Sequence, residues 1–127
     1  MTGNVRHEID DTPQVRPHVR LCHQMLSEGL TSGFSAVELT PVPDAMPQAR
    51  VQSAGSWKPY MAFPKAAYSQ IVSRLREMAG LAPDEADGDG AILVRWSGRE
   101  ASIALRAQRN EHGEERILLT FPAGAAT

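Results

Sequence analysis

The chain has 127 residues, which is enough for one domain with a buried core and too few for two. Its formal net charge of −2 argues against the strongly basic proteins that bind nucleic acid or acidic lipid. The single cysteine, Cys22, rules out a disulfide within the chain, and no apolar run reaches the roughly 18 residues of a membrane span. We therefore expect a cytoplasmic protein that neither binds nucleic acid nor inserts into a membrane.

The N-terminal part of the sequence predicts a flexible segment followed by a helix. Residues 1–16 contain acidic residues and proline without any apolar period, which favours disorder. Pro17 is typical of the first turn of a helix. From Leu21 to Leu30 the apolar residues recur at helical spacing, and Gly33 ends the pattern.

Three strands are expected between this helix and the next. The segments 34–42, 48–56 and 57–63 are short, rich in strand-forming residues and separated by turn residues. Pro59 cannot donate a ladder hydrogen bond, so the third strand should lie at a sheet edge or be interrupted.

The second helix has the clearest pattern in the chain. It should begin after Pro64 and end at Gly80. One face carries an apolar stripe of Tyr68, Ile71, Val72, Leu75, Met78 and Ala79. The other face carries Ser69, Gln70, Ser73, Arg74, Arg76 and Glu77, which we expect to be exposed.

The last third of the sequence predicts three antiparallel strands, at 91–96, 99–108 and 116–121. An acidic loop precedes them. Together, the elements predict an α+β fold in which helices pack on one face of an antiparallel sheet. We expect one domain over residues 17–121 and a disordered tail over 122–127.

Candidate metal ligands are few. The four histidines are His7, His18, His23 and His112, and no pair has zinc-ligand spacing supported by cysteines. His18, Cys22 and His23 are close together on the first helix, so a metal site there is an alternative. We favour a surface histidine and a packed, unreactive thiol.

The acidic loop contains Asp84, Glu85, Asp87 and Asp89. Its residue order does not match a calcium-binding loop, because the required register and the closing glutamate are missing. We interpret it as a solvated loop, and we expect neither a metal nor another cofactor in this protein.

The sequence also lacks the phosphate-binding loop of nucleotide hydrolases. That loop requires a lysine directly after a glycine. The chain has only Lys58, which follows Trp57, and Lys65, which follows Pro64. We therefore expect no catalytic activity of this type.

The segment SRLREMAGL (73–81) resembles the sRiKvMAGLD segment of the ATPases that drive type II secretion and type IV pilus assembly. In that family the segment belongs to a PAS-like domain that precedes the RecA-like ATPase core. Further segments resemble the same domain in the same order, from residue 20 to residue 121: HQMLSEGLTSGFSAVELTP, ARVQSAGSWKPYMAFP, GAILVRWSGREASIALR and EHGEERILLTF.

The resemblance implies two arginines of interest. In the family, arginines of this domain reach phosphates bound at the ATPase core. Arg50 matches the first arginine of the family's R-x-R-x-D-G pattern, and Arg106 matches the arginine of its dlR segment. The pattern is incomplete here, because Gln52 replaces its second arginine and Ala54 replaces its aspartate.

The family's HGE motif is matched by His112, Gly113 and Glu114. The sequence ends where the family's ATPase core would begin. The resemblance therefore implies a non-catalytic PAS-like domain that acts as an adaptor or regulator of a secretion or pilus motor ATPase, with Arg50, Arg106, His112 and Glu114 as its candidate interaction surface. One alternative is a sensor for a small ligand or phosphate held by Arg50 and Arg106, and another is a divergent remnant without a role.

Overall fold

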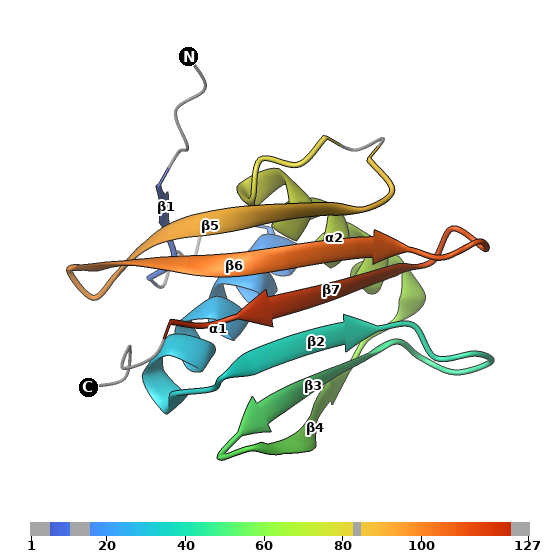
Figure 1. Cartoon of the computed structure of the whole chain (residues 1–127), viewed down its shortest axis with the longest axis horizontal. Helices are drawn as coiled ribbons and strands as arrows, with labels where there is room; N and C mark the ends of the chain where they lie inside the picture. Colours follow the sequence, from blue (N-terminus) through green and yellow to red (C-terminus); the bar gives the residue numbers. More distant parts are fainter. Residues whose placement is uncertain (1–5, 11–15, 83–84, 123–127) are drawn as a thin grey trace.

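A computed structural model of the chain describes residues 6–10, 16–82 and 85–122. The tail expected to be disordered falls almost entirely outside these residues, as do large parts of the expected flexible segment. The described elements form one sheet and two helices (Figure 1). Their order is β1 (His7–Glu8), α1 (Pro17–Ser32), β2 (Ala36–Thr40), β3 (Gln48–Ser53), β4 (Ser56–Ala62), α2 (Lys65–Met78), β5 (Gly88–Trp96), β6 (Arg99–Arg109) and β7 (Glu115–Thr120).

The sheet has seven strands in the order β1-β5-β6-β7-β2-β3-β4. All neighbours are antiparallel except β1 and β5. Both helices lie on the same face of the sheet, behind it in Figure 1, and no described helix lies on the other face. The predicted α+β class is confirmed, and the opposite face, hereafter the open face, is left without a helical layer.

Both helices end as their sequences predict. Gly33 caps α1 with a φ of 71°, a backbone conformation that glycine adopts without strain, and its N–H donates to the carbonyl of Gly29. Gly80 follows α2 with a φ of 76°. Neither of these helices has the length and apolar character needed to cross a membrane, within the described residues.

The core lies between the helices and the sheet. The predicted stripe of α2 is buried along its whole length, from Tyr68 to Ala79, and packs with the buried residues of α1 and of the strands. Arg76 is an exception to the prediction, because it was assigned to the polar face and is 3 % exposed. Its position four residues after Val72 brings it back to the buried side of the helix.

Pro59 lies on an edge strand, as expected. β4 is the outermost strand on its side of the sheet. Its register with β3 shifts so that Ala49 pairs with Met61 and Arg50 with Pro59, which leaves Tyr60 as the extra residue of a β-bulge. The phenol of Tyr60 donates a hydrogen bond to Glu28 of α1, so the bulge attaches this edge to the helical layer.

Two expectations about loops are wrong. Residues 6–10 were expected to be flexible, yet β1 pairs with β5 and Ile9 is 2 % exposed in the core. Ile9 is a single buried residue without apolar neighbours at strand spacing, so the sequence contains no periodic pattern that would predict this short strand. Likewise, β5 begins at Gly88 and not at residue 91 as expected. Within this added part of the strand, a Cβ at Gly90 would lie 2.7 Å from the carbonyl oxygen of Ala79, so the close approach requires a glycine.

Candidate functional site

The structure divides the four predicted interaction residues between two places. Arg50 of β3 and Arg106 of β6 lie on the open face. His112 and Glu114 lie in the turn between β6 and β7, at one end of the sheet. The four residues therefore do not form a single site.

On the open face, cross-strand pairing places Arg50 and Arg106 in one line. Glu38 of β2 is opposite Arg50 on one side and Leu118 of β7 on the other. Leu118 is in turn opposite Arg106. The four residues form a continuous row, hereafter the open-face row, and three strand spacings separate the backbones of the two arginines by about 14 Å.

The two guanidinium groups of this row contact residues on its outer sides. Arg50 lies 5.6 Å from the ring centroid of Trp57 on β4, at a distance typical of a cation–π contact. Arg106 Nε is 2.9 Å from Asp89 Oδ1 on β5, and both of these side chains are exposed. Because β4 and β5 lie on opposite sides of the row, the arginines are directed apart and do not converge on one phosphate.

The match to the HGE motif corresponds to a tight turn. Asn110 organises it, since its Oδ1 accepts hydrogen bonds from the backbone N–H groups of His112 and Glu114, both at 2.9 Å. Gly113 has a φ of 78°, which favours glycine. The His112 side chain is 74 % exposed and its Nε2 lies 3.7 Å from Glu111. Backbone geometry alone accounts for the glycine of the motif.

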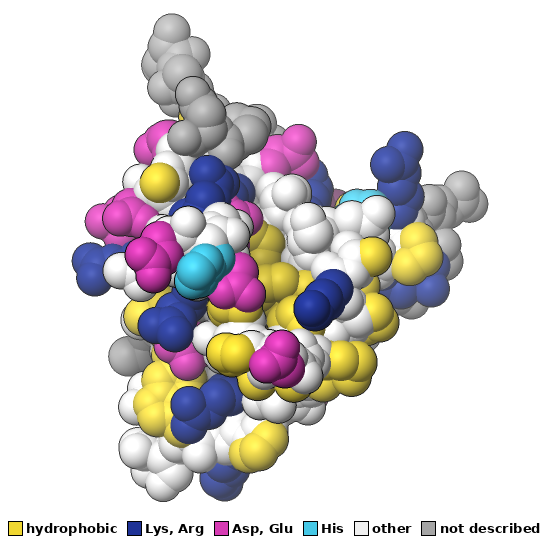
Figure 2. Space-filling view, turned by 90° about the vertical axis from the view of Figure 1, so that its right-hand side faces the viewer, with side chains coloured by type: hydrophobic (Ala, Val, Ile, Leu, Met, Phe, Trp, Pro, Cys, Tyr) yellow, Lys and Arg dark blue, Asp and Glu magenta, His cyan; other side chains and the backbone are white. Residues whose placement is uncertain are grey.

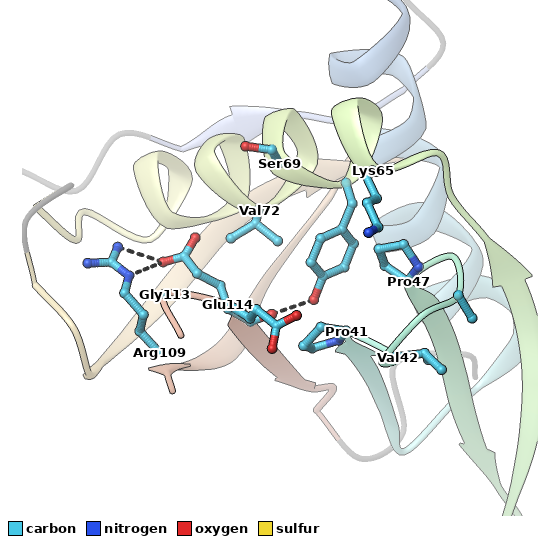
Figure 3. A pocket seen from close by; sticks show the side chains of 12 residues that line it. Pro41, Val42, Pro47, Lys65, Ser69, Val72, Arg109, Gly113 and Glu114 are labelled. Atoms are coloured by element: carbon cyan, nitrogen blue, oxygen red, sulfur yellow. Dashed lines mark hydrogen bonds and ion pairs between the residues drawn. The ribbon is translucent and has the colours of Figure 1, made fainter. Parts of the chain in front are cut away.

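Glu114 also borders a pocket of 430 Å³ at this end of the molecule. The pocket lies between the β2–β3 loop, the first two turns of α2 and the β6–β7 turn. In Figure 2 hydrophobic side chains line a hollow on this side, and charged side chains border it. Figure 3 shows Lys65 beside Pro47, Glu114 beside Pro41, and Val72 on the side of the helix.

Polar groups in and beside this pocket bind one another. Glu115 Oε1 lies 2.7 Å from Arg109 Nη2 and 2.8 Å from Arg76 Nε, so two cations share one carboxylate. Arg76 also donates to the carbonyl of Glu85 at 2.8 Å. The Tyr68 hydroxyl donates to the carbonyl of Glu115 at 2.5 Å. These contacts connect α2 to β7 and to the loop that precedes β5, so they stabilise the fold. Only the residues at the rim of the pocket remain for contact with a ligand.

The thiol of Cys22 is packed in the core, as predicted. It is 0 % exposed, its Sγ–H points to the Ile71 carbonyl at 3.7 Å, and burial raises its pKa to about 12. A thiol in this environment is not a nucleophile. Among the described residues, no three His, Cys, Asp or Glu side chains are grouped so that they could hold a metal ion.

Sequence reasoning missed Trp57 and the Arg76–Glu115 pair. Trp57 is 37 % exposed, an unusual degree for a large hydrophobic residue, and lies beside Arg50. Its position on an edge strand was predicted, but its partner depends on the β3–β4 register. The spacing from Val72 was a signal for the burial of Arg76, whereas nothing in the sequence identifies Glu115 as its counter-ion.

No protein-family model matches the chain, and no curated protein matches it at a significant level. The resemblance to the secretion and pilus motors therefore rests on the segments quoted above alone.

Proposed function

We propose that this protein is a non-catalytic interaction module of the cytoplasm that binds its partner through the open face of the sheet. The observation that carries the proposal is the Arg50–Trp57 pair at one end of the open-face row. Arginine and tryptophan are enriched among the residues that dominate binding energy at protein interfaces. Here they lie together on a sheet face that no described helix covers.

The partner that we propose is a secretion or pilus motor ATPase, with this chain as its adaptor or regulator. The support is the ordered series of resembling segments and the position of Arg50 and Arg106, which match arginines that face the ATPase core in that family. A phosphate sensor built on these two arginines has less support, because their contacts direct them apart.

A binding experiment with purified motor ATPase tests this proposal. We expect an Arg50→Ala/Arg106→Ala variant to keep its urea midpoint and to lose at least about tenfold in affinity, since interface arginines are frequent hot spots. The matched control is Arg20→Ala/Lys65→Ala, which removes the same charge from exposed positions of the two helices. If the first variant binds with unchanged affinity and the control binds more weakly, the open face is not the interface, and the interface lies on the helical layer.

A further inference from the structure

The segment of residues 6–10, hereafter the N-terminal strap, is held against the edge of the sheet by short backbone pairing, by polar side chains and by one core residue. The N–H of Ile9 donates to the carbonyl of Arg95 at 3.2 Å. Asp10 accepts a hydrogen bond from the N–H of Ser97 at 3.0 Å. The Ile9 side chain is 2 % exposed and belongs to the core. β1 pairs only two residues with β5 (Figure 1). Partly exposed charges add to this attachment, because Arg6 donates to the carbonyl of Val94 at 3.1 Å and lies 3.5 Å from Glu100, and Glu8 lies 3.5 Å from Arg95.

Histidine side chains lie at the place where the strap meets the helical layer. His23 of α1 is 8 % exposed, and neither of its ring nitrogens has a hydrogen-bond partner among the described residues. His7 of the strap is hydrogen-bonded to the backbone of Met78, at the end of α2. Arg74 of α2 acts electrostatically on both histidines. A strap, two helices and three basic side chains thus meet in one cluster.

The charges of this cluster oppose protonation of either histidine. Burial lowers the pKa of His23, and the positive charges of Arg74 and His7 lower it further. Burial also lowers the pKa of His7, followed by Arg74, while the hydrogen bond with Met78 and the charge of Glu77 act in the opposite direction. Glu77 is itself paired with Arg74 and has a side chain that is 69 % exposed, so it compensates only in part.

We propose that the N-terminal strap is a pH-sensitive latch, which is docked on β5 while His7 and His23 are neutral and is released when they are protonated. Protonation in the docked state places positive charges beside Arg74 and in a buried position, whereas release moves His7 into water and away from Arg74 and His23. Release uncovers the backbone edge of β5 at Val94 and Arg95.

The direction of the pH dependence follows from linkage. His7 has a lower pKa when docked than the ordinary 6.5 that it regains in water, and its departure removes one of the charges that lower the pKa of His23. The released state therefore binds more protons, and docking keeps its full stability above about pH 6.5. That stability is lost as the pH falls below this value, by up to about tenfold for His7 at pH 5.5.

Amide hydrogen exchange of the full chain between pH 5.5 and 7.5, corrected for the intrinsic rate, tests the latch. We expect the protection of the Ile9 and Ser97 amides, which bond to Arg95 and Asp10, to fall by up to about tenfold toward pH 5.5. The amides of β6 and β7 should keep their protection, which separates release of the strap from global unfolding.

Three variants make this test specific. His7→Gln and His23→Gln should each remove part of the pH dependence, and His7→Gln remains informative if the buried His23→Gln variant fails to fold. His112→Gln, in the exposed turn between β6 and β7, is the matched control and should behave as the wild type. Constant protection of Ile9 and Ser97 across this range, or an undiminished loss in the His7→Gln variant, would overturn the proposal.

Discussion

Successive residues of β6 lie in two different environments. Ile103 and Leu105 are 0 % and 2 % exposed beneath the helices, whereas Ala104 and Arg106, on the open face between and beside them, are exposed to solvent. Strand geometry produces this alternation, since neighbouring side chains point to opposite faces. The same strand therefore contributes to stability with one set of residues and is free to contribute to binding with the other.

The two faces of the sheet differ in the side chains that they carry. The covered face is filled by aliphatic side chains in contact with α1 and α2. The open face combines arginine, glutamate, leucine and tryptophan in the open-face row and beside it. Arg76 departs from this division, because it is a charge within the covered layer.

Arg76→Ala should have the largest effect on stability. It leaves the partly buried Glu115 with one cation fewer and the carbonyl of Glu85 without its donor. Loss of one partner of a buried ion pair destabilises a protein by about 3–5 kcal/mol. Urea denaturation measures it, with Arg74→Ala as the matched control, since the Arg74–Glu77 pair is partly exposed and contributes about 0–1 kcal/mol. Equal midpoints for the two variants would show that Arg76 is not held in the covered layer.

Leu105→Ala and Arg106→Ala compare the two faces at adjacent positions. Removal of the buried leucine should destabilise the fold by about 2–5 kcal/mol through lost burial and the cavity left behind. Removal of Arg106, which has an exposed ion pair, should change stability by less than about 0.5 kcal/mol. Thermal or urea unfolding of both variants gives the answer, and a large effect of Arg106→Ala would contradict the assignment of the open face to binding.

Gly29→Ala should have a smaller but measurable effect. A Cβ at Gly29 would overlap the ring of Phe121, so α1 or the ring must shift. Overpacking of this kind costs about 1–3 kcal/mol, although alanine favours the helix by up to about 1 kcal/mol. The control is Gln24→Ala, an exposed position of the same helix. If the unfolding midpoints of Gly29→Ala and Gln24→Ala coincide, the close packing of Phe121 against α1 does not contribute to stability.

Much of the fold could be predicted from the sequence because its signals are local. The stripe from Tyr68 to Ala79 is periodic and is buried as predicted. Pro59 marked an edge strand because proline has no N–H to donate. The N-terminal strap gave no such signal, since its single core residue, Ile9, has no periodic neighbours.

By itself, the sequence determined the two helices, the strands other than β1 and the α+β class, because helix and strand periods and turn residues act over a few positions. Only the tertiary structure decided which residues meet. The row of Arg50, Glu38, Leu118 and Arg106 comes from the register of four strands. Likewise the burial of Arg76 beside Glu115 and of His23 beside His7 depends on how distant elements pack. Contacts between residues far apart in the chain leave no period in the sequence, so the sites that they form appear only when the chain is folded.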